Sequence, residues 1–257
     1  MKKSLRPSCA AVIGTAALLF NPIANAASRP EPLVGAFSRI VIPTSANVAG
    51  VGGSQFRTKV AILNATTQSY NIQVTLFSTG GQLATASIPM ASKQLRNYEN
   101  FLADVFNIGS GFGALVFESG GTGRDFIVTS EVYNDIGQGR YKTVVSAGPL
   151  LENALPEFDS YSLGILVDDN TRTNIGFYND SNESNAVSAE VYDAAGVLLT
   201  TVPATLAPKA WSQVSLSQRV TNGFIRWRVQ GSAYCWAVVV DNKSADGTFL
   251  PAADFLP

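Results

Sequence analysis

The sequence contains no histidine, and this absence removes most side-chain catalysts from consideration. It has only two cysteines in 257 residues, and charged residues make up only 14% of the chain. Without histidine there is no Ser-His-Asp or Cys-His nucleophile and no histidine-bearing zinc site. The chain also lacks any run of about 18 apolar residues, the minimum for a membrane-spanning helix. We therefore expect neither an enzyme of these classes nor a transmembrane segment in the mature chain.

The first 26 residues have the pattern of an export signal. Basic residues precede an uncharged apolar run over residues 10–20, and small residues lead to a predicted cleavage site after Ala26. Cleavage would leave Cys235 as the one remaining thiol, so we expect no internal disulfide. The sequence thus predicts a secreted or periplasmic protein.

The charge of the chain is small and evenly mixed. The formal net charge is −1, with 18 basic and 19 acidic residues. Nucleic-acid binding needs a clustered basic face, and the nearest approach, Arg226 and Arg228, alternates with apolar residues as a solvated strand face would. We therefore expect no nucleic-acid partner.

An internal repeat organises the rest of the chain. Residues 56–64 read FRTKVAILN, and residues 171–179 return as TRTNIGFYN. A fixed echo of this kind indicates two copies of one folding unit. A proline-bounded stretch separates the copies and reads as a short linker. The predicted boundaries are a signal peptide over residues 1–26, a first unit over residues 27–149, a linker over residues 150–157 and a second unit over residues 158–257.

Inside each copy the apolar residues recur with a period of two, as around residues 72–76 and 187–191. This alternation predicts antiparallel strands with one buried face. We expect an all-β chain of two tandem Ig-like β-sandwich domains, with hairpin turns at residues 79–82 and 194–197. Residues 44–55 of the first copy are glycine-rich and predict a long loop.

A helical spacing interrupts the strand pattern. Apolar residues from Tyr98 to Phe106 follow a period near 3.6, with Asn97 available as a cap, and residues 214–220 repeat the pattern weakly. We expect a short crossover helix in each copy. A resemblance to known proteins lies in three segments: the Phe56-Arg57-Thr58 opening that runs to Asn64, this aromatic helix, and the Gly-Ala-Leu-Val strand at residues 113–116. In these segments the chain resembles tandem β-sandwich repeats of exported bacterial proteins without an assigned activity. The resemblance implies the fold and supplies no catalytic residues.

Four repeated residues are candidates for specifying the fold. Arg57 and Arg172 begin the repeated strand, and Asn64 and Asn179 end it. An asparagine at a strand end closes an Asx-turn against its own backbone, whereas the arginine would pin a neighbouring carboxylate. Because both copies carry them, we expect a structural role rather than a ligand role.

Two further clusters are candidates for binding. Trp211 follows a proline-lysine turn, where its indole could be exposed. An exposed indole, together with Tyr178, Asn179 and Asp180, would suit the binding of a sugar ring. The alternative is that Trp211 belongs to the core. The loop residues 168–170 (Asp168, Asp169 and Asn170) are hard oxygen donors for calcium, or an ordinary Asx-rich turn. No other cofactor is expected. Asp168 has no counterpart in the first copy, which disfavours a catalytic carboxylate pair.

These features predict a secreted, non-enzymatic structural, adhesive or surface-interaction protein built from two repeated modules. The alternative is a carbohydrate-binding module that acts through the second copy. The partner would be a protein or a glycan at the cell surface.

Overall fold

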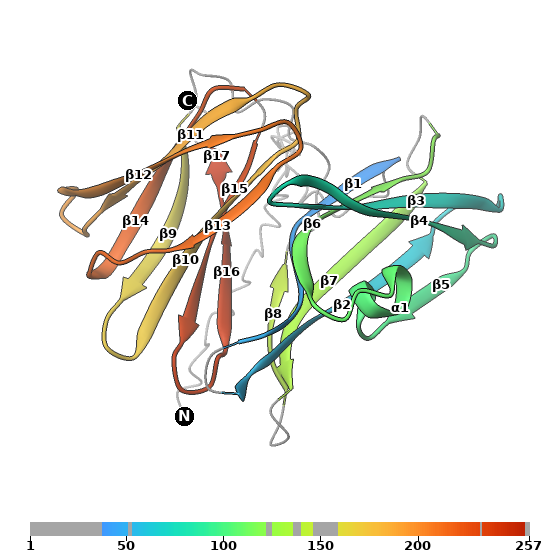
Figure 1. Cartoon of the computed structure of the whole chain (residues 1–257), viewed down its shortest axis with the longest axis horizontal. Helices are drawn as coiled ribbons and strands as arrows, with labels where there is room; N and C mark the ends of the chain where they lie inside the picture. The colour runs from blue at the N-terminus through green and yellow to red at the C-terminus, as the bar shows by residue number, and fades with distance from the viewer. Residues whose placement is uncertain are drawn as a thin grey trace, which may run out of the picture. The chain divides into compact units, whose positions relative to one another are not determined.

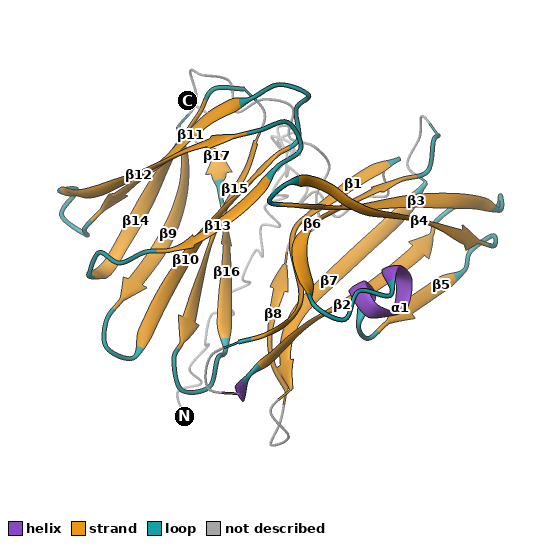
Figure 2. Cartoon of the chain, in the orientation of Figure 1, coloured by secondary structure: helices purple, strands orange, loops and turns teal. Residues whose placement is uncertain are grey.

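The chain folds almost entirely into antiparallel β-strands (Figure 1, Figure 2). The computed structural model describes residues 38–50, 53–121, 125–135, 140–145, 159–231 and 233–254. The predicted signal peptide and linker lie outside these residues. The strands are β1 (Arg39–Ala49), β2 (Gln55–Asn64), β3 (Tyr70–Ser78), β4 (Gly81–Met90), β5 (Leu95–Tyr98), β6 (Gly111–Glu118), β7 (Phe126–Asp135), β8 (Arg140–Val145), β9 (Ser160–Val167), β10 (Thr171–Asn179), β11 (Asn185–Tyr192), β12 (Leu198–Leu206), β13 (Trp211–Ser215), β14 (Val220–Val229), β15 (Ala233–Asp241), β16 (Gly247–Pro251) and β17 (Ala253–Asp254).

Strands β1 to β8 form the first lobe, a single sheet that folds into two layers. The strand order is β4-β3-β6-β1-β2-β7-β8, with β5 paired to β2. Strand β1 pairs with β6 over most of its length and with β2 only through Asn47–Ala49. It therefore joins the layer β4-β3-β6-β1 to the layer β5-β2-β7-β8. Apolar residues of both layers, such as Ile62 and Leu115, are fully buried between them.

Strands β9 to β17 form the second lobe, which consists of two separate sheets. Their orders are β12-β11-β14-β9-β17 and β13-β10-β15-β16. Apart from β17, each order matches one layer of the first lobe, strand for strand. The predicted alternation is confirmed in both lobes, because Ile72, Val74 and Leu76 are buried in β3 and Val187 and Val191 in β11. The predicted hairpin turns also lie between β3 and β4 and between β11 and β12.

Two glycines repeat a close approach between strands. A Cβ atom at Gly113 would lie 2.0 Å from the backbone oxygen of Phe77, and one at Gly223 would lie 2.3 Å from that of Tyr192. Any larger residue would push apart the strands of the layer. The same backbone arrangement thus recurs in β6 and β14.

Three expectations about local structure are wrong. The described residues contain one α-helix, α1 (Phe101–Phe106), which is preceded by Asn100, whereas Asn97 lies in β5. The second lobe has no helix within residues 159–231, because β13 takes up residues 211–215 and pairs with β10. The predicted loop from residue 44 is also shorter, since β1 continues to Ala49. No helix in the described part of the chain is long and apolar enough to cross a membrane.

A third group of buried residues lies between the lobes, which belong to one compact unit. Val41, Ala114 and Val116 come from the first lobe, and Tyr178, Trp211 and Trp236 come from the second. Because strand residues alternate between faces, the neighbours of Val116 in β6, Leu115 and Phe117, point into the first lobe's own core. Strands β6 and β10 are therefore buried on both faces.

The two copies differ in the residues at this contact. Trp211 pairs with Tyr178 across β13 and β10, and the matching pair of the first lobe is Leu95 with Leu63. Leu95 is 56% exposed, whereas Trp211 is 5% exposed. Three large aromatic residues of the second lobe, Tyr178, Trp211 and Trp236, thus lie on the face that the first lobe covers, and they include two of the three tryptophans.

Candidate functional site

The repeated asparagines hold the loops that follow β2 and β10. Asn64 is fully buried, and its amide nitrogen donates to the backbone oxygens of Gln68 (2.7 Å) and Ala91 (2.8 Å), while its Oδ1 accepts from the backbone nitrogen of Thr66 (2.8 Å). Each bond satisfies a backbone group of a connecting loop. Asn64 therefore closes an Asx-turn and ties two loops together.

Asn179 makes the same bonds in the second lobe. Its amide nitrogen donates to the backbone oxygens of Glu183 (2.7 Å) and Ala207 (2.9 Å), and its Oδ1 accepts from Ser181 (3.0 Å). Asn179 is fully buried, so it is not a surface ligand residue.

Tyr178 and Asp180 belong to a buried ion cluster that joins the lobes. Oδ1 of Asp180 accepts from Arg39 of the first lobe (2.8 Å), from the Tyr178 hydroxyl (3.0 Å) and from Lys209 (3.3 Å). The Asp180 side chain is 2% exposed. Burial raises the pKa of Tyr178, and the nearby charge of Asp180 raises it further. Burial lowers the pKa of Arg39, but hydrogen bonds and charge from Asp180 and Glu118 outweigh this and leave it raised.

Trp211 is buried against the first lobe rather than exposed. Its indole nitrogen donates to the backbone oxygen of Pro43 (2.9 Å). The pairing of β1 with β6 is irregular between Ile42 and Ser45, so this carbonyl is available to the indole. The expectation of an exposed indole that stacks on a sugar, flanked by Tyr178, Asn179 and Asp180, is therefore wrong in its geometry.

The acidic loop after β9 forms a turn. Oδ1 of Asp168 accepts from the backbone nitrogen of Asn170 (2.8 Å), which is an Asx-turn. Asp169 pairs with Arg219 (3.0 Å) at the surface. Within the described residues, no three acidic or cysteine side chains gather as metal ligands. The geometry at Asp168, Asp169 and Asn170 supports the turn interpretation.

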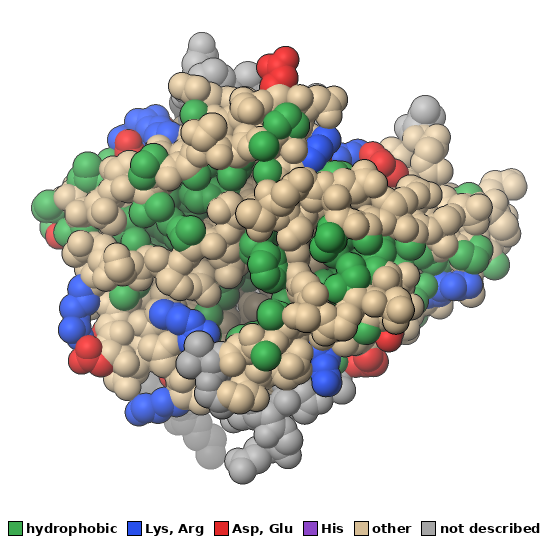
Figure 3. Space-filling view, viewed as in Figure 1, with side chains coloured by type: hydrophobic (Ala, Val, Ile, Leu, Met, Phe, Trp, Pro, Cys, Tyr) green, Lys and Arg blue, Asp and Glu red, His purple; other side chains and the backbone are tan. Residues whose placement is uncertain are grey.

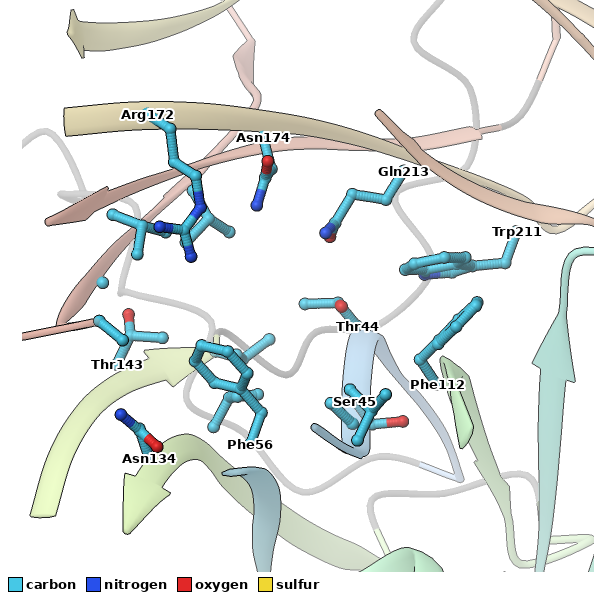
Figure 4. Close-up of a pocket in the computed structure, with 18 of the residues that line it drawn as sticks. Thr44, Ser45, Phe56, Phe112, Asn134, Thr143, Arg172, Asn174, Trp211 and Gln213 are labelled. Carbon is cyan, nitrogen blue, oxygen red and sulfur yellow. The ribbon is translucent and has the colours of Figure 1, made fainter. Parts of the chain in front are cut away.

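A cavity of about 380 Å³ lies between the lobes. Figure 3 shows the surface hollowed where the lobes meet. In Figure 4, Arg172, Asn174 and Gln213 point into the cavity from β10 and β13. Phe56 and Thr44 of the first lobe lie on the opposite side. The volume is in the range of small-molecule sites, which are typically about 300–1,000 Å³.

The ring pair of Phe112 and Trp211 and the guanidinium of Arg172 lie at opposite ends of the cavity (Figure 4). The rings of Phe112 and Trp211 lie 5.0 Å apart between centroids. At the other end, Arg172 donates to Oδ1 of Asn242 (2.7 Å), and Oδ1 of Asn174 accepts from Ser215 (2.6 Å). The expected partner of Arg172, a carboxylate, is thus replaced by an amide. Burial lowers the pKa of Arg172.

Hydrogen bonds between the lobes surround the cavity. The backbone nitrogen of Phe249 donates to the Thr143 hydroxyl (3.0 Å), and the Asn134 amide reaches the backbone oxygen of Ser244 at 3.5 Å. Thr143, Asn134 and Trp211 all line the cavity as well. Some residues of its wall therefore also hold the lobes together.

Sequence reasoning missed this cavity, although it singled out two of its lining residues, Arg172 and Trp211. The repeat predicts the same fold-specifying role for Arg172 and Arg57, but of the two only Arg172 lines the cavity. One signal was present in the sequence. The copies differ at matched positions, with tryptophan at 211 and leucine at 95, and a large aromatic residue in only one copy marks a face with a different environment.

Comparison with known proteins adds no family. No family model matches the chain, and no curated protein sequence matches it. Among solved structures, beta-glucuronidase 2 of Bacteroides uniformis, covalently bound to cyclophellitol-6-carboxylate aziridine, aligns at 11% identity and a TM-score of 0.16 over 82% of this chain and 25% of that one. Another Bacteroides uniformis beta-glucuronidase structure aligns at 12% identity with the same TM-score and coverage. The chain spans about a quarter of these structures' length, and a TM-score of 0.16 carries no argument.

Proposed function

We propose that this chain is an exported, non-enzymatic interaction protein that holds a small molecule in the cavity between two copies of one β-sandwich unit. The single observation that carries this proposal is the mixed apolar and polar lining of the cavity. Aromatic rings offer apolar area, and amide, hydroxyl and guanidinium groups of the same lining offer directional hydrogen bonds. Such a combination is typical of ligand sites.

The duplication is supported by repeated detail as well as by strand order. The hydrogen bonds of Asn64 recur at Asn179, and those two residues end matching strands. Lys93 and Lys209 both have a left-handed backbone, with φ near 54° and 57°. Each lysine also donates to the backbone oxygen of the residue after the repeated asparagine: Lys93 to that of Ala65, and Lys209 to that of Asp180. We infer that one ancestral unit was copied and that the second copy acquired the aromatic contact face.

The non-enzymatic assignment is supported by the chemistry of the lining. Arg172 is the one ionisable side chain among the described lining residues, so they supply no general base and no pair of carboxylates. The serine and threonine hydroxyls there have no histidine to activate them, because the chain contains none. Ligand capture without turnover fits this set of groups.

Carbohydrate remains the alternative ligand class for the second lobe. This alternative is now supported by the cavity, where the Gln213 side chain lies near the ring of Trp211 (Figure 4). Amide groups beside an aromatic ring suit the hydroxyls and apolar face of a sugar.

The test is a binding screen of small acids, amides, aromatic compounds and sugars by thermal shift and calorimetry. Gln213→Trp would fill the cavity, because the exposed Gln213 side chain points into it. Val214→Trp is the matched control, since Val214 is the next residue of β13, is 41% exposed and does not line the cavity. We expect hits that are lost in Gln213→Trp and kept in Val214→Trp. Hits that persist in Gln213→Trp, or a broad panel without a hit, would refute the proposal.

A further inference from the structure

We propose that the ligand of the interlobe cavity carries a carboxylate that pairs with Arg172. This inference rests on the proposed function and names the chemical class of the ligand. The observation behind it is an imbalance of charge. The described lining contains one cation, Arg172, and neither an aspartate nor a glutamate.

The guanidinium of Arg172 is held in place but not neutralised. Within the described chain its hydrogen-bond partner is Oδ1 of Asn242, at 2.7 Å, and that partner is neutral. Burial lowers the pKa of Arg172, and no acidic side chain lies in the part of the cavity lining that the structure describes. A half-buried cation without a counter-ion gains more from an anionic ligand than a solvated one does. The planar fork of arginine also matches the two oxygens of a carboxylate.

Two neighbouring polar residues, Asn174 and Thr143, each have a donor free to face a ligand. Oδ1 of Asn174 already accepts from Ser215 at 2.6 Å, which leaves its amide nitrogen to donate. The Thr143 oxygen already accepts from the backbone nitrogen of Phe249 at 3.0 Å, which leaves its hydroxyl hydrogen to donate. Both residues line the cavity with Arg172. A donor-rich end with one positive charge selects an acceptor that is negatively charged.

The opposite end sets the remainder of the ligand. Phe112 and Trp211 present rings there, and Phe56 lies on the same side of the cavity as Thr44 (Figure 4). A volume of about 380 Å³ accommodates a compound of one or two rings rather than a chain of sugars. The ligand class is therefore a small ring-bearing carboxylic acid, either an aromatic acid or a uronic acid.

The experiment compares each acid with a neutral analogue. Calorimetry would measure benzoate against benzamide, and galacturonate against galactose, on the wild-type protein, Arg172→Gln, Arg172→Lys and Arg219→Gln. Arg219 is the matched control, because it is an exposed arginine of the same lobe outside the cavity lining. Circular dichroism would verify that each variant is folded.

We expect the wild-type protein to prefer the acid of at least one pair by about tenfold or more, the scale of a charge-assisted hydrogen bond. This preference should vanish in Arg172→Gln, survive in part in Arg172→Lys and remain intact in Arg219→Gln. The pair that shows it would separate an aromatic acid from a uronic acid. Equal binding of acid and neutral analogue, or a preference that survives Arg172→Gln, would overturn the inference and leave cavity binding standing. Failure of the wider screen to give any cavity ligand would overturn both. The acid preference of the wild-type protein is itself a test if the Arg172 variants do not fold.

Discussion

Replacing Asp180 with asparagine should destabilise the whole protein, because this one carboxylate joins the two lobes. Its side chain is 2% exposed, and its Oδ1 accepts from Arg39 at 2.8 Å, Tyr178 at 3.0 Å and Lys209 at 3.3 Å. Asparagine keeps the shape and one acceptor oxygen but removes the charge. The change therefore tests the charge and not the packing.

The magnitude follows from the difference between charged and neutral hydrogen bonds. A bond to a charged group contributes about 1.5–3 kcal/mol, and a neutral one about 0.5–1.5 kcal/mol. The three bonds of Asp180 would each weaken by about 1 kcal/mol, and the lower desolvation cost of a neutral amide would offset part of the loss. Arg39 and Lys209 are 28% and 29% exposed, so water screens some of the effect. We expect a loss of about 2 kcal/mol in the free energy of unfolding.

The assay is urea unfolding followed by tryptophan fluorescence, because Trp211 and Trp236 lie between the lobes. Asp169→Asn is the control. Its pair with Arg219 has a similar length, 3.0 Å, but the two side chains are 84% and 67% exposed, so a loss below about 0.5 kcal/mol is expected. A loss in Asp180→Asn no larger than in Asp169→Asn would refute the reasoning. A double-mutant cycle with Arg39→Gln should give a coupling energy of about 1 kcal/mol or more.

Three other predictions concern single residues. Asn64→Ala and Asn179→Ala should each lower the free energy of unfolding by about 2–4 kcal/mol, since each leaves several buried backbone groups unpaired. A marked difference between the two variants in urea unfolding would argue against equivalent roles. Gly113→Ala should lower the midpoint of thermal unfolding strongly, because the new Cβ would lie 2.0 Å from the backbone oxygen of Phe77. Gly80→Ala should have little effect, because the space around Gly80 is open. Equal effects of the two changes would contradict the close approach at Gly113. Burial raises the pKa of Tyr70 to about 12, and the charge of Asp125 adds to this. The free energy of unfolding should therefore fall as the pH rises from about 10 towards 12, because the unfolded chain loses this proton first. Urea unfolding at a series of pH values should show a shallower fall in Tyr70→Phe than in the wild-type protein.

The sign of the alkaline prediction follows from proton binding. Above the ordinary tyrosine pKa of about 10 the unfolded state has released a proton that the folded state still holds, so rising pH favours unfolding. The hydroxyl of Tyr70 donates to the backbone oxygen of Asp125 at 2.6 Å, and ionisation would break this bond. An unchanged slope in Tyr70→Phe would show that this hydroxyl does not contribute.

Local sequence patterns were sufficient for the strands and their turns. The alternation around residues 72–76 and 187–191 predicted which side chains are buried, because a strand exposes its two faces in turn. The helix was the weaker case. The spacing at residues 214–220 resembled that near Phe106, but pairing of β13 with β10 outweighed the helical preference of so short a segment.

The sequence alone determined an all-β chain of antiparallel strands and excluded every chemistry that needs histidine. Those properties depend on residue type and on neighbours in the chain, which the sequence displays directly. Only the tertiary structure decided that Trp211 and Asp180 are buried between lobes and that Arg172 faces a cavity. Which face of a sandwich meets another lobe depends on contacts between residues far apart in the chain, such as Arg39 with Asp180, and no local pattern encodes that pairing.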